Sequence, residues 1–319
     1  MTPTITGMNE LAMSSSELGN KVKNLAALVQ AGVRVPRGFG LPYDFYTDHI
    51  KSLLPDIRRA HEQFVDYADM AKQIQEIMVS KPFAGASKVH SALELYMPDA
   101  TYFAVRSSGA PVIAGSEASE DSSNKSFAGQ YESFLLVPRH NVPQAILLCY
   151  ASLFSRRCLE EFNVKKDMGY LNSRMSVLIQ EMCRANLSAV VFTQDPDDKN
   201  IFGMEITYGA CEAIVSGEVT PDAHYFDRAT GIEVKSQLGA KKERIEYEPL
   251  IDLNKENKVI RSVSDGLRER YAAPPELRTR IYDIGMYIER HFGVPQDIEL
   301  VVADDEIIVV QTRPITTSE

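Results

Sequence analysis

Apolar residues recur along the chain at two spacings, one typical of helices and one of strands. Leu18, Val22 and Leu25 form a stripe at helical spacing. This stripe predicts a helix that serines at 14–16 cap and that ends near Gln30. Further helices are predicted at about 43–96, 143–162 and 275–291, and strands at 102–105, 176–181, 189–193, 202–207, 224–226, 298–302 and 307–312. Strands and helices mixed in this way indicate an α+β or α/β fold.

A low-complexity segment interrupts this pattern at residues 107–130, which read SSGAPVIAGSEASEDSSNKSFAGQ. It contains seven Ser and three Gly, too little apolar surface to pack by itself. It is also too long for an ordinary connection, so it is a linker or a functional lid. Its place between two structured regions favours a mobile lid.

The last two predicted strands form a hairpin with polar residues at one end. A loop of residues 304–306 would pair Ala303 with Ile307, Val301 with Val309, and Glu299 with Gln311. Arg313 then shares a face with Gln311. A carboxylate and an amide at the end of buried strands need a partner. Mg²⁺ prefers such oxygen ligands, but a salt bridge between Glu299 and Arg313 would satisfy the pattern equally well.

Two cations interrupt apolar surroundings nearer the N-terminus. Lys21 lies within the stripe of the first helix, where it must reach solvent or meet an anion. Arg106 follows a short apolar strand and opens the Ser/Gly segment, whose backbone N–H groups could cradle phosphate. Taken alone, each position also fits a purely structural role: Lys21 could extend its ammonium to solvent, and Arg106 could form a surface ion pair.

Composition narrows the possible classes of function. The 319 residues carry 34 Lys and Arg against 44 Asp and Glu, a net charge of −10. Such an acidic chain is not expected to bind nucleic acid. No apolar run suits a membrane span or a signal peptide, and the four cysteines show no CxxC spacing. We therefore expect a reduced, cytoplasmic protein.

Motifs for other phosphate chemistry are missing from the sequence. No GxxxxGK[ST] loop and no protein-kinase catalytic loop is present. The six histidines are scattered, and none sits in a turn that would present it as a phosphate carrier. We interpret all six as structural or surface residues.

Eight ordered blocks resemble the N-terminal nucleotide-binding domain of the phosphoenolpyruvate synthase and pyruvate phosphate dikinase family, which rifampin phosphotransferase shares. The resemblance runs from about Leu18 to Thr316. The blocks are LGNKVKNLAALVQAGVRVPRGF, AVRSSG, SFAGQYESFL, CYASLFSRR, VLIQEM, VVFTQDP, GACEAIVSGEVTPD, and PQDIEL with VVQTRPIT. Together they are far more specific than any one of them.

The resemblance implies an α+β fold of the ATP-grasp type, with two lobes at 1–182 and 183–319 that clamp ATP. Matched to the family motifs, Lys21 and Arg106 would contact phosphates, and Gly129 and Gln130 would lie in the lid. The remaining matches are an adenine-contacting segment of Gln180, Glu181 and Met182, the Mg²⁺ ligands Glu299 and Gln311, and the charge-stabilising Arg313. The chain departs from the family at Asn20, where a second glycine usually precedes the lysine, and in a stretch at 111–118 that looks inserted.

The resemblance also implies a mechanism in which a histidine takes the β-phosphoryl of ATP, leaving AMP and phosphate, and passes it to an acceptor. The family carries that histidine on a further domain, and this chain ends at QTRPITTSE, where the linker to it normally begins. We expect the histidine on a separate partner subunit, as in the split aryl phosphate synthases such as phenylphosphate synthase, with a phenol as the hydroxyl acceptor. The alternatives are an ATP-binding domain of a phosphoenolpyruvate synthase or a rifampin phosphotransferase-like enzyme, or a non-catalytic ATP-sensing module.

Overall fold

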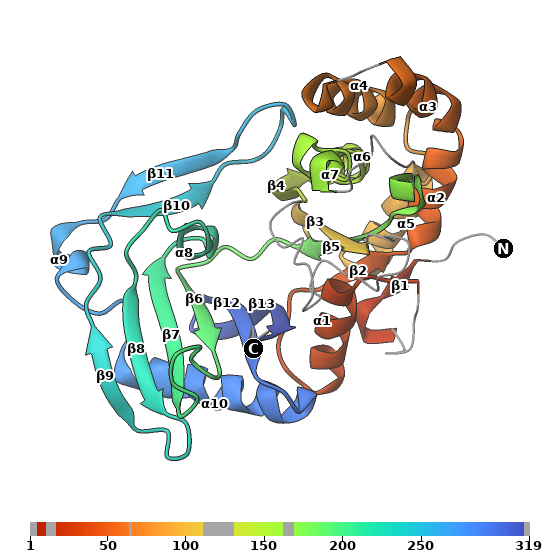
Figure 1. Ribbon diagram of the computed structural model, residues 1–319. Coiled ribbons are helices and arrows are strands. Elements are labelled where there is room, and N and C mark those ends of the chain that lie inside the picture. Colours follow the sequence, from red (N-terminus) through yellow and green to blue (C-terminus); the bar gives the residue numbers. More distant parts are fainter. Residues whose placement is uncertain (1–4, 11–16, 64–65, 111–130, 162–168, 316–319) are drawn as a thin grey trace. The chain divides into compact units, whose positions relative to one another are not determined.

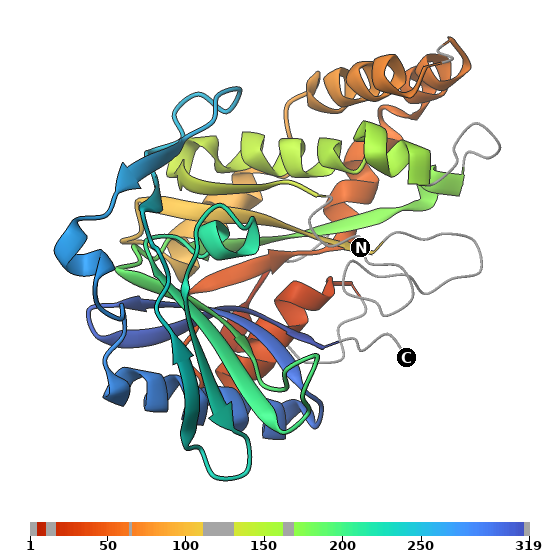
Figure 2. The same ribbon diagram turned by 60° about the vertical axis from the view of Figure 1, so that its left-hand side comes forward.

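The computed structural model describes residues 5–10, 17–63, 66–110, 131–161 and 169–315 (Figure 1 and Figure 2). The chain divides into two compact units, each built on a sheet of its own. Unit 1 comprises Met1–Ala26, Arg37–Met182 and Pro249–Glu256, and unit 2 comprises Ala27–Pro36, Cys183–Glu248 and Asn257–Glu319. Helix α1 (Asn20–Gln30) therefore contributes residues to both units.

Unit 1 contains a five-stranded antiparallel sheet in the order β1-β2-β5-β3-β4. Its strands are β1 (Thr6–Gly7), β2 (Gly38–Leu41), β3 (Tyr102–Ala110), β4 (Ser133–Pro138) and β5 (Arg174–Glu181). The helices of this unit, besides α1, are α2 (Tyr43–Lys51), α3 (Leu54–Gln63), α4 (Tyr67–Val79), α5 (Ala86–Tyr96), α6 (Val142–Ser152) and α7 (Arg156–Glu161). Three short 3-10 helices accompany them: η1 (Met8–Glu10), η2 (Arg139–Asn141) and η3 (Gly169–Asn172).

The two faces of the unit 1 sheet differ in character. Val105, Val177 and Ile179 share one face, because strand residues two apart point the same way and Val105 pairs with Ile179. All three are fully buried in the main hydrophobic core, together with apolar residues of α2 and α6. The opposite face carries Arg106 and Gln180, and it is the face on which α1 begins.

Unit 2 contains a six-stranded antiparallel sheet in the order β13-β12-β6-β7-β8-β9, and a separate pair, β10 and β11. The strands are β6 (Leu187–Phe192), β7 (Ile201–Tyr208), β8 (Asp222–Asp227), β9 (Glu233–Gln237), β10 (Glu243–Tyr247), β11 (Lys258–Ser262), β12 (Gln296–Ala303) and β13 (Glu306–Pro314). The helices are α8 (Glu212–Val215), α9 (Asp265–Arg268) and α10 (Pro275–Phe292).

Helix α10 packs along one face of the six-stranded sheet, as Figure 1 shows. The ring of Tyr282 lies 5.0 Å from that of Phe202 and 5.6 Å from that of Phe226, centroid to centroid. The predicted helix at 275–291 is confirmed almost to the residue, because its ends are clear in the sequence. Pro275 occupies the first turn, and Gly293 ends the helix with a φ of 72°, which favours glycine.

Other predicted boundaries need correction. Strand β3 continues to Ala110, so residues 107–110 are not part of a loop: they pair with residues 174–177 of β5. Backbone pairing with a buried neighbouring strand outweighs the low strand propensity of Ser and Gly. The remaining lid residues, 111–130, lie outside the described residues, as do the serines predicted to cap α1, which begins at Asn20.

Two further differences concern elements within unit 1. The predicted helix at 143–162 is two helices, α6 and α7, with residues 153–155 between them. The second difference is β2, which none of the predicted strands covers and whose four residues are all buried against β5. The mixture of antiparallel sheets and packed helices nevertheless confirms the predicted α+β class.

Candidate functional site

The structure groups the predicted site residues into two sets, one within each unit. In unit 1, Lys21 lies in the first turn of α1, and its Nζ donates a hydrogen bond to the Ser107 carbonyl oxygen at 3.1 Å. Arg106 is the next residue in the same strand, β3. The lysine that interrupts the apolar stripe is therefore directed to the strand that carries the predicted phosphate-binding arginine.

The segment expected to meet adenine, residues 180–182, forms the end of β5 and the residue beyond it. The Glu181 amide donates to the Arg37 carbonyl at 2.8 Å, and the Met182 amide donates to the Tyr102 carbonyl at 3.0 Å. These two N–H groups are already bonded within unit 1. A base that binds this segment would therefore use groups other than these two amides.

Gln180 supplies such a group. Its side chain is 2% exposed, and its Nε2 has no hydrogen-bond partner among the described residues. A buried amide donor without a partner costs free energy unless a ligand or water accepts from it. Gln180 pairs with Ala104 in β3, two residues from Arg106, so both side chains lie on the α1 face of the sheet. This face fits a ligand with several acceptor atoms, as a nucleotide has.

The neighbouring Glu181 carboxylate is held from outside the strand. Arg37 donates from Nε and Nη2 to its two oxygens, at 2.7 and 3.0 Å, which is a bidentate pair. The same guanidinium bonds Asp99 at 2.8 Å and thereby lowers the pKa of that carboxyl. Arg37 thus fixes the end of β5 where the adenine-contacting segment is expected.

In unit 2, the C-terminal hairpin brings the two expected metal ligands together. Glu299 pairs directly with Gln311, as predicted, and Gln311 Nε2 lies 3.1 Å from Glu299 Oε1. The predicted register of the hairpin tip is wrong. The structure pairs Ala303 with Glu306, Val302 with Ile307, Val301 with Ile308, and Leu300 with Val309.

Two compensating irregularities explain why the important pair survives this error. The turn has two residues rather than three, since Asp304 and Asp305 adopt positive φ angles of 49° and 63° that suit a tight hairpin. A bulge between Glu299 and Leu300 then shifts the register by one residue. The bulge restores Glu299 and Gln311 to opposite positions and places them on one face.

Arg313 forms its ion pair with Asp297, whereas the sequence alternative gave it Glu299 as a partner. Its Nε and Nη2 lie 2.8 and 2.7 Å from Asp297 Oδ2, and the two residues are directly paired. Asp297 lies two residues before Glu299 and so points to the same face. Sequence reasoning missed Asp297, although alternation along the DIEL motif would have indicated it.

A further carboxylate lies on this face. Across the sheet, Glu299 pairs with Val190 of β6, and Val190 pairs with Glu205 of β7, so the three side chains form one row. Burial raises the pKa of Glu205. The prediction missed Glu205 too, yet its polar position between the apolar Met204 and Ile206 is a period-2 signal.

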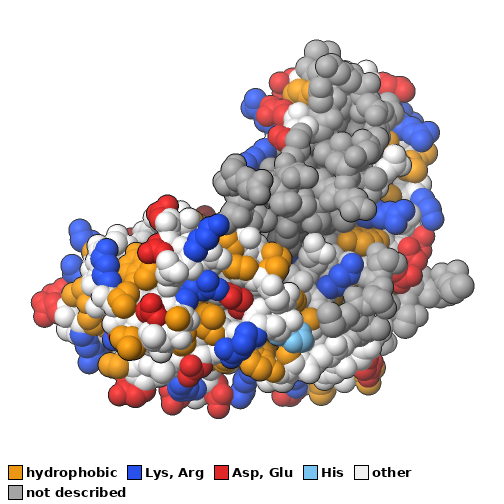
Figure 3. Space-filling view, turned by 60° about the horizontal axis from the view of Figure 1, so that its bottom comes forward, with side chains coloured by type: hydrophobic (Ala, Val, Ile, Leu, Met, Phe, Trp, Pro, Cys, Tyr) orange, Lys and Arg blue, Asp and Glu red, His pale blue; other side chains and the backbone are white. Residues whose placement is uncertain are grey.

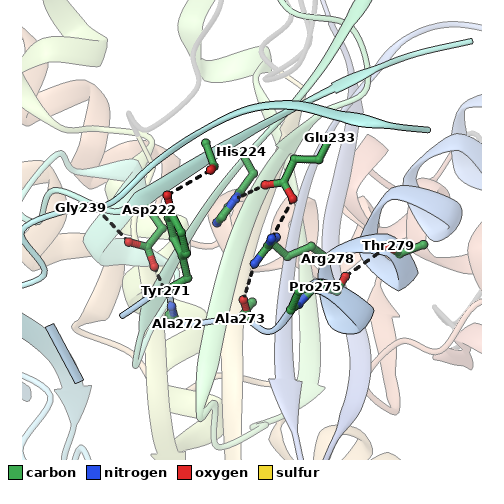
Figure 4. Close-up of polar contacts among 11 residues, drawn as sticks. Asp222, His224, Glu233, Gly239, Tyr271, Ala272, Ala273, Pro275, Arg278 and Thr279 are labelled. Atoms are coloured by element: carbon green, nitrogen blue, oxygen red, sulfur yellow. Dashed lines mark hydrogen bonds and ion pairs between the residues drawn. The ribbon is translucent and has the colours of Figure 1, made fainter. Parts of the chain in front are cut away.

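The opposite face of the same sheet holds a different set of charges, and Figure 4 shows those around Asp222, His224 and Glu233. His224 Nδ1 lies 2.7 Å from Glu233 Oε1, and Arg278 Nη2 lies 2.7 Å from Glu233 Oε2. Asp222 accepts hydrogen bonds from the amides of Gly239 and Ala272, and pairs with the fully buried Lys241. Burial lowers the pKa of His224. This network joins β8, β9 and α10 and touches none of the predicted site residues.

The metal-binding capacity of the Glu299–Gln311 pair is limited. No group of three His, Cys, Asp or Glu side chains within the described ranges is placed to hold a metal ion. Mg²⁺ often takes only one or two protein oxygens and completes its shell with water and phosphate oxygens. The amide of Gln311 would have to present Oε1 in place of Nε2, a rotation that its planar group permits. These donors therefore fit Mg²⁺ bound together with a phosphate ligand.

The structure says less about the predicted lid, about membrane spans and about surface charge. Gly129 and Gln130, expected in the lid, lie outside the described residues, as does the stretch at 111–118. None of the described helices is long and apolar enough to cross a bilayer. On the face in Figure 3, Lys and Arg are interspersed with Asp and Glu, and the residues coloured there form no basic stripe.

Comparison with known proteins identifies the domain that carries these residues. Residues 15–319 match the family described as pyruvate phosphate dikinase, AMP/ATP-binding domain. The chain belongs to this family. It is thus a dikinase-type AMP/ATP-binding domain, which is the family implied by the sequence blocks.

Relatives of this dikinase domain agree with that assignment. A probable phosphoenolpyruvate synthase of Methanothermobacter thermautotrophicus is 30% identical over 94% of this chain and 44% of its own length. A rifampicin phosphotransferase of Streptomyces sviceus is 30% identical over 94% of this chain and 34% of its own length. The chain thus spans less than half of the length of these curated relatives.

Among solved structures, D-alanine–D-alanine ligase from Bacillus anthracis shares 9% identity with the dikinase domain. The match covers 96% of this chain and 60% of the ligase, with a TM-score of 0.32. This likeness is too weak to add to the family assignment.

Proposed function

We propose that this chain binds ATP with Mg²⁺ and passes the β-phosphoryl group to a histidine on a separate partner subunit, with AMP and phosphate formed. The observation that carries the proposal is the polar face of the unit 2 sheet. Glu299 and Gln311 lie opposite each other there, and Arg313 is held beside them by Asp297. Metal ligands next to a fixed cation are what phosphoryl transfer needs, since its catalysis is mostly positioning and neutralisation of charge.

Each predicted residue has a role in this scheme. Glu299 and Gln311 would hold Mg²⁺, which offsets the charge of the phosphate oxygens. Lys21, Arg106 and Arg313 would bind the phosphates, and the orphaned Gln180 amide would donate to the nucleotide. The guanidinium of Arg313 would be directed at the transferring group by its ion pair with Asp297.

The acceptor is proposed to be a histidine outside this chain. All six histidines lie within the described residues, and none belongs to α1, β3, β5, β12 or β13, which carry the described site residues. His224 lies in the same sheet as Glu299 but on the opposite face, fully buried beside Glu233. It could not reach a phosphate bound at Glu299 without unfolding the network around it.

The final acceptor is proposed to be a small hydroxyl compound that the partner binds. A phenol is our specific proposal, and it rests on the resemblance to split aryl phosphate synthases. Pyruvate or an antibiotic hydroxyl, which the names of the relatives suggest, would be the outcome if the chain works as a phosphoenolpyruvate synthase or rifampicin phosphotransferase domain.

The test is to incubate the chain with ATP and Mg²⁺, with and without a candidate histidine-bearing partner, and to measure AMP, ADP and phosphate. AMP that forms only with the partner, together with a phosphorylated partner histidine, is the expected result. ADP as the product would overturn the dikinase mechanism. ATP binding without turnover in any pairing would favour a non-catalytic ATP-sensing module.

A further inference from the structure

The turn that precedes α1 is pressed against strand β3. A Cβ atom on Gly19 would lie 2.1 Å from Ser108 Oγ and 2.3 Å from the Ser108 carbonyl oxygen. Such distances exclude any side chain at this position without movement of β3. The backbone of the turn thus approaches the strand so closely that this position requires glycine.

A single hydroxyl group fastens this turn to the sheet. Ser176 of β5 lies directly opposite Ser108 and is fully buried. Its Oγ accepts a hydrogen bond from the Gly19 amide at 2.8 Å and donates one to the Ser108 carbonyl oxygen at 3.1 Å. The hydroxyl therefore uses both its donor and an acceptor lone pair, and it connects three segments that are distant in sequence.

The same turn decides where α1 begins. The Gly19 carbonyl accepts the Lys23 amide at 3.2 Å, the first bond of the helix. Lys21 is two residues beyond Gly19, and its Nζ bonds the carbonyl of Ser107, the neighbour of Ser108. Arg106 and Ser107, whose carbonyl accepts from Lys21, are neighbours in β3. A shift of the turn relative to β3 would therefore move the Lys21 ammonium relative to Arg106.

We propose that Ser176 is a positioning residue for the phosphate-binding lysine: its hydroxyl fixes the turn before α1 on β3 and so holds Lys21 beside Arg106. This inference rests on the proposed ATP-binding function. Ser176 itself need not touch the nucleotide. Its effect should therefore appear only with ligands that carry phosphates, since Lys21 is expected to bind those and not the nucleoside.

The test uses the full chain and calorimetry with two probes, Mg-ATP and adenosine. In Ser176→Ala we expect the Kd for Mg-ATP to rise about tenfold, within the range that one lost hydrogen bond allows. The Kd for adenosine should change less than twofold. In a Lys21→Met background, Ser176→Ala should cause no further loss of ATP affinity, because the residue acts through the lysine.

Controls separate positioning from general stability. Ser152→Ala removes another buried hydroxyl of unit 1, which donates to the Cys149 carbonyl oxygen within α6, and should leave both Kd values unchanged. Ser176→Cys serves as the test variant if the alanine variant does not fold. Equal losses for ATP and adenosine, or additive losses with Lys21→Met, would overturn the inference. A wild-type chain that binds neither probe would instead refute the proposed function.

Discussion

The two faces of the six-stranded sheet in unit 2 both carry charged residues, but the charges are satisfied in different ways. On the α10 face, Lys241 and Asp222 have no exposed side-chain surface and pair with each other (Figure 4 shows the surroundings of Asp222). On the opposite face, the Arg313 side chain is 35% exposed although it is paired with Asp297. The Lys241–Asp222 pair is closed to solvent, whereas the Arg313 side chain on the other face stays accessible to a ligand.

This difference suggests a way to separate structural from functional charges in a fold. A network that buries every charge among its own members stabilises the native packing, and its loss should unfold the protein. A cluster that leaves charge at a surface is only partly satisfied and can bind a ligand without breaking the fold. Four substitutions test the distinction.

The largest effect is expected at Lys241. Lys241→Met leaves the Asp222 carboxylate buried without its cation, which should lower the free energy of unfolding by about 3–5 kcal/mol. Chemical denaturation measures this loss. The exposed neighbour Lys242 provides the control, and Lys242→Met should change stability by less than about 0.5 kcal/mol. The double variant Lys241→Met, Asp222→Asn should recover part of the loss, and failure to recover would contradict the charge explanation.

The second effect concerns the face that carries Arg313. If the proposed function holds, Glu299→Ala should reduce AMP formation with the partner by about a hundredfold or more, since it removes a proposed ligand of the Mg²⁺ that would stabilise the phosphoryl group. The melting temperature should stay within about 2 °C of wild type. Glu306→Gln, an exposed carboxylate of the same hairpin, should retain full turnover. Unfolding of the Glu299 variant, with activity intact in the surviving fraction, would show that both faces are structural.

The third effect is a dependence of stability on pH through His224, on the α10 face. Burial lowers the pKa of His224, so the unfolded chain binds a proton more readily than the folded one. Stability should therefore fall as pH drops below about 6.5, with a slope of at most about 1.4 kcal/mol per pH unit for one proton. Glu233, Arg278, Asp222 and Tyr271 surround the ring.

Melting curves between pH 7.5 and 5 measure this dependence. His224→Gln should flatten the slope over that range, because glutamine does not titrate. His140→Gln, at an exposed position, should retain the wild-type slope. Glu233 should cause a further loss of stability at lower pH. Burial raises the pKa of its carboxyl, but hydrogen bonds from Arg278 and His224 outweigh burial and hold this pKa below its usual value.

The smallest effect is expected at Glu205, on the face that carries Arg313. Burial raises its pKa, so its ionised form destabilises the fold at neutral pH. Glu205→Gln should raise the melting temperature by about 1–3 °C at pH 7.5. This gain in melting temperature should fade as the pH falls through the pKa of Glu205 in the folded chain, because the protonated glutamic acid is then as neutral as the glutamine of the variant. Glu243→Gln, at an exposed position, should show no gain, and an equal gain there would mean that net charge alone is responsible.

Much of the candidate site could be proposed before any coordinates, because it depends on residue types at fixed spacing. Lys21, Arg106, Glu299, Gln311 and Arg313 stand out as polar residues within apolar patterns. Alternation along the DIEL motif indicates the face of Asp297, but its pairing with Arg313 depends on the register of the hairpin. The hairpin prediction gave the right pair at Glu299 for the wrong reason, since neither the two-residue turn nor the bulge has a strong signal in the sequence.

The family, the α+β class and the helix ends that proline and glycine mark could be predicted from the sequence, because they follow from local residue chemistry. Only the folded chain shows that residues 107–110 form a strand, that Ser176 bridges Gly19 and Ser108, and that charges divide between two faces of one sheet. These features arise from contacts between segments distant along the chain. Local propensity carries no information about such contacts, since packing and backbone pairing override it.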